Sequence, residues 1–408
     1  MAVGIRIQAR LLSGEVKNDK IHAMASEAST LSGTAVVEPG PDGPGRLIPP
    51  APVAQRLFSL DVFRGFTMFW IVGGAALARG LGKLDSNAVM AGLAYQLSHS
   101  DWQGLRFYDL IWPSFMLMTG MSLPFSYAKR SLTQSHREIF MRVLRRCAVL
   151  FLLGSLRESI SFQHPYLVEL SSALQPIAIA YFAAFLLVRT SWRVQAGVGA
   201  AILVFYALLL AFVPAPGVPA GSYDRNANLV LWVDQVTLGR VLPEHWGTVI
   251  STIPTIATTI LGMLLGKILM SSRANAAKIK IIALVGISAI ALGWALNPVI
   301  PIVMKLWTAS YGLASAGFAC LMFLLFYWIV DVLGYRRWSF PFIVIGMNAV
   351  FIYMSASIIP WSKTVAIFTT PLAGTLGSFA ALFHALVVLA VEWLVLYWMY
   401  RRKIFLSA

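Results

Sequence analysis

Residues 97–120, LSHSDWQGLRFYDLIWPSFMLMTG, begin with polar and charged side chains and become almost wholly apolar within a dozen positions. The rest of the 408-residue sequence has the same character, because 58% of its residues are apolar and 12% are charged. Soluble domains carry about 25% charged residues. Long apolar runs recur along the chain, and about 20 apolar residues form a helix that crosses the hydrocarbon core of a bilayer. The sequence therefore predicts an all-α, polytopic transmembrane helix bundle.

Two regions of different composition divide the chain. Residues 1–55 are rich in Gly, Pro, Ala and Ser and show no sustained apolar periodicity, which predicts a disordered N-terminal tail. Residues 56–408 are predicted to form one transmembrane domain. Its ten candidate spans are residues 65–83, 108–127, 140–157, 171–188, 194–213, 248–268, 279–296, 309–333, 339–360 and 377–400.

The distribution of positive charge predicts the orientation of these spans. If the tail is cytoplasmic, the segments on that side hold 19 Lys and Arg residues, the opposite side holds 8, and the tail holds 5. Cytoplasmic loops of membrane proteins collect Lys and Arg. We therefore expect both termini in the cytoplasm, His99 at the outer face, and a location in a bacterial inner (plasma) membrane. The same bias accounts for the net charge of +15 without nucleic-acid binding.

A polar cluster lies where the opening stretch meets the second span: His99, Asp101, Trp102, Arg106 and Asp109. Ionisable groups at a bilayer are costly, so they are usually paired or functional. An imidazole can accept or donate a proton near neutral pH, and a neighbouring carboxylate can orient it. The residues alone leave two interpretations open: a catalytic histidine oriented by one of the two aspartates, or an interfacial histidine held by hydrogen bonds.

Other polar residues in apolar runs also have two interpretations. Asp61 and Arg64 share a helix face and either fix the helix end or help hold an anion. Gln175, before Pro176, either bonds a freed carbonyl or lines a cleft. Neither a metal-binding HExxH, a phosphate loop nor a nucleophile elbow occurs in the sequence, and both cysteines lie in apolar runs, so we expect no metal site.

Several motifs together resemble the heparan-α-glucosaminide N-acetyltransferase family, which includes a lysosomal enzyme and bacterial membrane homologues. They are RLFSLDVFRGF, the 97–120 stretch, ALQPIAIAY, TIPTIATTILGMLLG, KLWTASYGL and GMNAVFIY, and the resemblance covers about residues 56–400. Its most specific block is matched by His99, Trp102, Gly104, Asp109, Leu110 and Pro113.

The resemblance implies transfer of an acetyl group from cytoplasmic acetyl-CoA to an amino sugar on the outer side, with His99 as the active-site histidine and Arg64 in the functional core. His99 would act as a general base or as a transient acetyl carrier. Cations suit the phosphates of CoA, and the candidates are Arg64, Arg145, Arg146, Arg336 and Arg337. The candidate substrate-binding residues are Trp102, Gln175, Lys305, Trp307 and Asn348. A homodimer is kept as a candidate assembly.

Two other functions stay open from the sequence. A sugar or glycolipid transporter or flippase would use Gln175, His384 and Glu392 as groups along its pathway. A catalytically degenerate membrane scaffold is the other alternative, because Ala75 stands where relatives carry a polar residue. Pro176 and Met304 are further departures from the family pattern.

Overall fold

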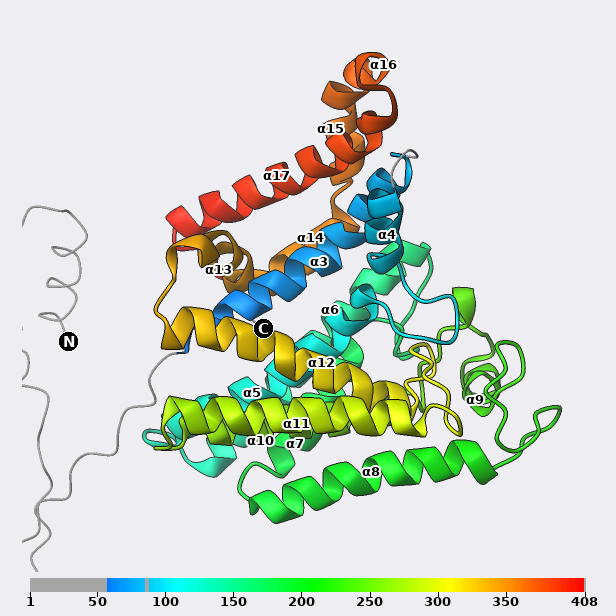
Figure 1. Ribbon diagram of the computed structural model, residues 1–408, viewed down its shortest axis with the longest axis vertical. Coiled ribbons are helices and arrows are strands. Elements are labelled where there is room, and N and C mark those ends of the chain that lie inside the picture. Colours follow the sequence, from blue (N-terminus) through cyan, green and yellow to red (C-terminus); the bar gives the residue numbers. More distant parts are fainter. Residues whose placement is uncertain (1–56, 85–87, 407–408) are drawn as a thin grey trace, which may run out of the picture. The chain divides into compact units, whose positions relative to one another are not determined.

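The computed structural model describes residues 57–84 and 88–406, and these residues form helices joined by loops, with isolated β-bridges such as Gln103–Val303 (Figure 1). The predicted tail, residues 1–55, lies outside the described residues. In chain order the described helices are α3 (Phe58–Gly82), α4 (Ala88–Gln96), η1 (Phe107–Leu110), α5 (Ile111–Ser131), α6 (His136–Phe162), α7 (Leu174–Leu186), α8 (Trp192–Phe212), α9 (Leu229–Leu238), η2 (Pro243–His245), α10 (Thr252–Met270), α11 (Asn275–Leu296), α12 (Ala309–Tyr327), η3 (Trp328–Val332), η4 (Arg337–Ser339), α13 (Phe340–Met347), α14 (Ala349–Ile358), α15 (Trp361–Thr369), η5 (Thr370–Leu372), α16 (Ala373–Leu376), η6 (Gly377–Phe379) and α17 (Ala380–Arg401). The all-α class predicted from the sequence is therefore confirmed for the described residues.

Fewer helices than the ten predicted spans are both long and apolar enough to count as membrane spans by these two criteria alone. Each predicted span overlaps a helix, but six helical segments of the described chain are long and apolar enough to cross a membrane, or seven with the bent pair α13–α14. Helix α7 is too short, with 13 residues, and α6 carries many charged side chains. The bent pair turns by 63° at Asn348. Length and composition thus support an integral membrane protein, while its span count and the side on which its termini lie stay predictions.

Local sequence signals explain several helix ends. Ser135 accepts a hydrogen bond from the backbone N–H of Glu138, whose carboxylate accepts one from the backbone of Ser135, so α6 begins with a capping box. Thr308 caps α12 in the same position. At the α13–α14 break, the Asn348 amide donates to the carbonyl of Ile404 and its oxygen accepts from the N–H of Leu406. These bonds tie the bend to the residues that follow α17.

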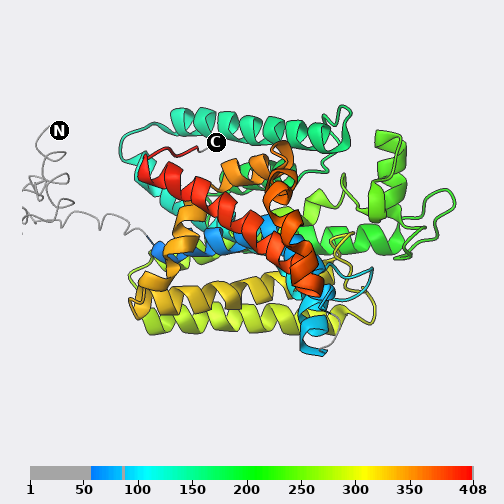
Figure 2. The same ribbon diagram turned by 90° about the horizontal axis from the view of Figure 1, so that it is seen from above.

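Glycines allow the helices that carry the core to approach closely. A Cβ on Gly120 of α5 would overlap the carbonyl oxygen of Thr259, and one on Gly262 of α10 would overlap that of Leu117. Small residues at such positions are typical of helix pairs in membranes, because they let backbones pack directly together. Helix α5 is thereby fixed against α10. Helix α3 contacts α5, α12, α13, α14 and α17, and Figure 2 shows it running between α6 and the α11–α12 pair.

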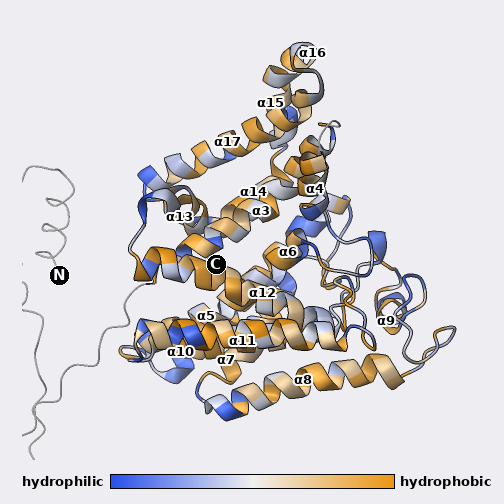
Figure 3. Cartoon of the chain, viewed as in Figure 1, coloured by the Kyte–Doolittle hydropathy of each residue, from blue (hydrophilic) through white to orange (hydrophobic). Residues whose placement is uncertain are grey.

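Apolar residues predominate along the helices, whereas hydrophilic residues gather at helix ends and in the loops around α9 (Figure 3). Only 22% of the apolar windows of α8 and α11 is buried inside the protein. Faces this apolar and this exposed need a hydrocarbon environment. Figure 1 places the start of α3, the end of α12 and the end of α17 on the same side. Arg64 lies near the first of these ends, Arg336 and Arg337 follow the η3 turn after the second, and α17 ends at Arg401.

Candidate functional site

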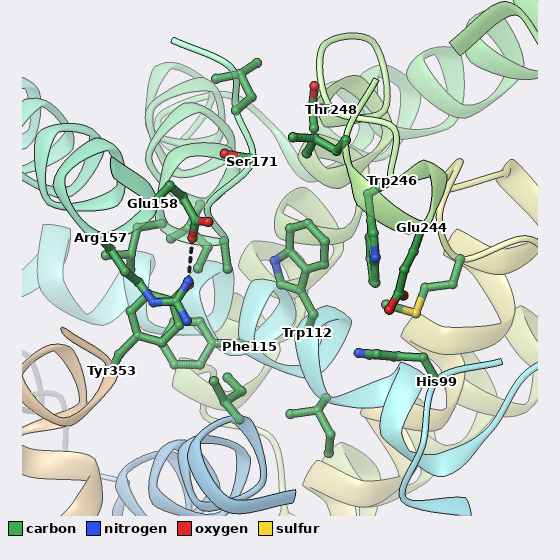
Figure 4. A pocket seen from close by; sticks show the side chains of 18 of the residues that line it. His99, Trp112, Phe115, Arg157, Glu158, Ser171, Glu244, Trp246, Thr248 and Tyr353 are labelled. Atoms are coloured by element: carbon green, nitrogen blue, oxygen red, sulfur yellow. Dashed lines mark hydrogen bonds and ion pairs between the residues drawn. The ribbon is translucent and has the colours of Figure 1, made fainter. Parts of the chain in front are cut away.

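A cavity of about 530 Å³ lies where helices from both halves of the chain meet. Its wall is formed by α3, the η1–α5 corner, the end of α6, the start of α7, the loop before α10, and α14 (Figure 4). This volume is typical of small-molecule sites, which span ~300–1,000 Å³ and are mostly apolar with a few placed polar groups. His99 lines this cavity and is the one residue of the predicted site that does so.

His99 is paired with Asp109. Its Nδ1 lies 2.9 Å from Oδ1 of Asp109, whose side chain is fully buried. The same carboxylate accepts from the backbone N–H of Arg106 at 2.9 Å and of Ser100 at 3.3 Å. Because a carboxylate accepts and does not donate, this geometry assigns the imidazole proton to Nδ1. The lone pair is then on Nε2.

The loop between α4 and α5 is folded so that the two residues meet. The Arg106 guanidinium donates to the carbonyl oxygen of His99 at 2.6 Å and to Ser98 Oγ at 2.9 Å, and it stacks over the ring of Tyr95. The hydroxyl of Tyr311 on α12 donates to the backbone carbonyl of Asp109 at 2.7 Å. These contacts fix the histidine from both sides of the loop.

Aromatic rings surround the imidazole. The ring of Tyr108 lies 4.6 Å from it and that of Trp246 lies 5.3 Å away at 80°, while Trp112 forms the middle of the cavity wall. Figure 4 shows the His99 ring projecting into the cavity with a nitrogen at its tip. The structure therefore presents a basic nitrogen in a largely apolar, aromatic-lined space.

The far side of the cavity carries a second polar group that the sequence analysis did not select. Arg157 and Glu158, at the end of α6, form an ion pair, and the Arg157 guanidinium lies 4.3 Å from the ring of Tyr353 on α14. Ser171 lines the same side. Two adjacent charges inside an apolar run were a usable signal, because such charges are functional hypotheses by default.

Backbone strain also gathers at the cavity. Positive φ values occur at the non-glycine residues Leu170 and Glu244, which line it, at His245, which follows Glu244, and at Trp307, which packs against the lining residue Trp112. Such conformations are uncommon and cluster at functional sites. The Asp234 carboxylate supports the strained loop by accepting from the N–H groups of Thr248 and Val249. Burial raises the pKa of Asp234, and those two backbone hydrogen bonds oppose the rise.

The remaining predicted site residues lie away from His99 or support the wall indirectly. Asp101 is 90% exposed and pairs with Arg106, not with His99. The Trp102 indole donates to the carbonyl of Tyr223. The Gln175 amide donates to Ser155 Oγ and to the Leu167 carbonyl.

Two outer-loop predictions, Lys305 and Trp307, pack behind the cavity. Lys305 is buried, lies 3.4 Å from the Glu244 carboxylate, and approaches the ring of Trp246. Trp307 is buried against Trp112 with ring centroids 5.0 Å apart. Both residues position the lining. Asn348, at the helix break, bonds through its side chain to the backbone of Ile404 and Leu406 and does not line the cavity.

None of the five candidate CoA-binding arginines lines the cavity. Arg64 pairs with Asp61 at 3.4 Å, and Arg146 lies over the ring of Tyr181. Arg336 lies over the ring of Phe58. Arg145 and Arg337 are exposed.

The groups considered for a transport pathway are dispersed. The His384 ring bonds with the hydroxyls of Thr369 and Ser362, which ties α17 to α15. Glu392 lines a separate, apolar cavity of about 290 Å³. Within residues 57–84 and 88–406, no group of three or more His, Cys, Asp and Glu side chains is placed to hold a metal ion.

Comparison with known proteins finds two similar curated proteins. Heparan-alpha-glucosaminide N-acetyltransferase from Mus musculus is 24% identical over 417 residues, covering 86% of this chain and 60% of that protein. The protein of the same name from Homo sapiens is also 24% identical, covering 86% of this chain and 59% of its own length. The chain thus spans about three-fifths of the curated relatives it matches. No family model matches the chain.

Proposed function

We propose that this chain, a distant relative of the heparan-alpha-glucosaminide N-acetyltransferases, is a membrane-embedded acetyltransferase. It transfers the acetyl group of cytoplasmic acetyl-CoA to the amine of an amino sugar on the outer side of a bacterial inner membrane. The observation that carries the proposal is the His99–Asp109 pair at the wall of the cavity, with Nε2 left to face a substrate.

The chemistry needs a base. An ammonium has no lone pair, so the acceptor first loses one proton to water and then attacks the thioester carbonyl carbon as a free amine. The new C–N bond forms as the C–S bond breaks. His99 Nε2 accepts the second proton from the nitrogen and passes it to the departing thiolate of CoA.

Asp109 supports this role in two ways. It keeps the proton on Nδ1, and its buried carboxylate stabilises the imidazolium that forms when Nε2 accepts a proton. The rings of Tyr108 and Trp246 pack beside the imidazole and reduce the space in which water could reach and hydrolyse the thioester.

A transient acetyl group on His99 would use the same nitrogen. The two routes differ in one respect: an acetylated histidine forms without acceptor, whereas direct transfer needs both substrates at once. Incubation with labelled acetyl-CoA alone, followed by rapid denaturation, distinguishes them by the label that stays on the protein.

The cavity favours an acetyltransferase over the transporter alternative. The three polar groups proposed for a pathway, Gln175, His384 and Glu392, do not line one cavity with His99 or with one another. A degenerate scaffold has no need of a buried carboxylate that orients an imidazole into an aromatic-lined cavity.

The test uses the full chain, purified in detergent, with labelled acetyl-CoA and glucosamine. Acetylated sugar is expected from the wild type, and replacing His99→Ala should abolish it. The matched control is His136→Ala at the opposite end of α6, whose ring stacks on Phe185 and does not line the cavity. No product from the wild type, or equal rates from the wild type and His99→Ala, contradicts the proposal.

A further inference from the structure

The far side of the main cavity has polar atoms that no protein partner satisfies. Arg157 Nε, Ser171 Oγ and Trp112 Nε1 are buried and have no hydrogen-bond partner among the described residues. Buried polar groups are almost always hydrogen-bonded, so each such atom needs an explanation. Three in one cavity point to a ligand that supplies the partners.

Glu158 adds an acceptor to these donors. One carboxylate oxygen binds the Arg157 guanidinium, and Figure 4 shows the other directed toward the middle of the cavity. In the same view the Trp112 indole nitrogen is directed toward the side on which Glu158 and Ser171 lie. Donors and an acceptor between aromatic rings match a ligand with several hydroxyl groups, whose O–H groups both donate and accept.

The charges of the lining restrict that ligand further. Of the described residues that line the cavity, Arg157 is the single Lys or Arg, and it is already engaged by Glu158 and by the Tyr353 ring. A second carboxylate, Glu244, also lines the cavity, and Lys305 behind the lining pairs with it. Phosphate, sulfate and uronate groups normally bind cations that are available to them. A lining whose cations are both engaged offers no free partner to an anionic sugar, so it favours a neutral or cationic one.

We propose that the side of the cavity opposite His99 is the binding subsite for the acceptor sugar, formed by Glu158, Arg157, Ser171 and Trp112, and that it selects an amino sugar without phosphate or other anionic groups. Glu158 is the specificity-determining residue: its free oxygen accepts hydrogen bonds from the sugar, and its charge cancels that of Arg157. The identity of the acceptor rests on the proposed function, whereas the subsite rests on the contacts above.

Binding in the absence of acetyl-CoA tests this inference directly. Trp112 and Trp246 line the cavity, so their fluorescence reports occupancy. The wild-type chain in detergent is titrated with glucosamine and with glucosamine 6-phosphate. We expect the Kd for glucosamine to be at least about tenfold lower than that for the phosphate, the factor typical of one charged contact.

The variant Glu158→Gln keeps the shape and removes the charge. Glucosamine should then bind about ten- to a hundredfold more weakly, because a charge-assisted hydrogen bond is lost. Arg157 loses its carboxylate partner at the same time, so the preference over glucosamine 6-phosphate should shrink or reverse. The control is Glu138→Gln, which changes the other carboxylate of α6, at the start of the helix, and should leave both Kd values unchanged.

A second variant covers the case in which Glu158→Gln does not fold. Ser171→Ala removes one hydroxyl and keeps both charges, and it should weaken glucosamine binding about two- to tenfold while keeping the preference for the unphosphorylated sugar. Four results overturn the inference: no binding of glucosamine by the wild type, equal affinity for the two sugars, folded Glu158→Gln that binds like the wild type, or an equal loss in Glu138→Gln.

Acetyl transfer, measured separately on the same proteins, distinguishes the two proposals. If sugar binding depends on Glu158 but no acetylated product forms, the subsite proposal is supported and the acetyltransferase proposal is contradicted. If Glu158→Gln forms acetylated product as well as the wild type does, the acetyltransferase proposal is supported and the subsite proposal is contradicted.

Discussion

The exchange of Asp109 for asparagine tests the chemistry at one atom. Oδ1 of Asp109 faces His99 Nδ1, and Oδ2 faces the backbone N–H of Arg106, with the N–H of Ser100 between them. An asparagine must place its NH₂ group at one of these two positions. The backbone N–H groups cannot become acceptors, whereas the imidazole can move its proton. The NH₂ group therefore faces His99 and donates to Nδ1.

This rearrangement puts the imidazole proton on Nε2, where the lone pair is needed. Loss of the correct tautomer in a comparable carboxylate–histidine pair lowers kcat on the order of 10⁴-fold. We expect Asp109→Asn to lose ~10³- to 10⁴-fold in kcat, with little change in KM because the cavity keeps its shape. The cost in stability should be about 1–3 kcal/mol, since charge-assisted bonds become neutral ones.

The measurement combines initial rates of glucosamine acetylation with a thermal unfolding curve in the same detergent. Asp101→Asn is the comparison, because this exposed carboxylate contacts Arg106 and not the imidazole, so its kcat should stay within about twofold of the wild type. A folded Asp109→Asn protein that keeps more than about a tenth of the wild-type kcat would refute the tautomer argument. Equal losses in the two variants would refute the assignment of Asp109 as the orienting carboxylate.

Three other changes have expected outcomes. Replacing Gly262→Val forces side-chain atoms onto the Leu117 carbonyl oxygen. The free energy of unfolding should therefore fall by about 1–3 kcal/mol and the melting temperature should fall with it. An unchanged melting temperature contradicts the close α5–α10 packing. Trp246→Ala opens the space beside His99, so hydrolysis of acetyl-CoA without acceptor should rise relative to transfer, whereas Trp246→Phe should stay near the wild-type ratio. Arg240→Gln removes the ion pair with Glu169 that joins the two loops over the cavity, which should raise the KM for the acceptor while changing the melting temperature little; an unchanged KM shows that this pair does not hold the loops in place.

The helices could be predicted because a long apolar run directly indicates a helix of about the same length. Each predicted span overlaps a helix, and the boundaries of α11, and of α12 together with the η3 turn that continues it, lie within a few residues of those expected. Whether a helix crosses the membrane depends on more than its apolar length. The break at Asn348 arises from bonds to Ile404 and Leu406, which come from another segment of the chain. Contacts of this kind leave no periodic signal in the sequence.

The sequence predicted the His99 side of the candidate site but not the Arg157 side. The polar cluster before α5 pointed to His99, but the sequence could not choose between Asp101 and Asp109. The choice is made by the fold of the loop, where Arg106 binds the His99 carbonyl and turns the ring toward the later aspartate. The opposite side depends on Arg157 meeting Tyr353, far along the chain, and no local pattern in the sequence reveals that pairing.

The positions of the basic residues relative to the cavity are consistent with the proposed transfer. Met68 is the α3 lining residue nearest to Arg64, and Phe115 is the α5 lining residue nearest to Lys129 and Arg130. On that side the cavity is therefore bounded by apolar side chains, and an apolar wall cannot solvate phosphate charges. Along α6, Arg146 precedes Arg157 by about 17 Å, at 1.5 Å per residue. The phosphates of CoA would then stay among the arginines, and only the slender, uncharged arm that carries the acetyl group would pass between the helices. The one arginine in the lining, Arg157, is engaged by Glu158, whereas arginines left free there would bring the phosphates into the cavity that the acceptor has to occupy.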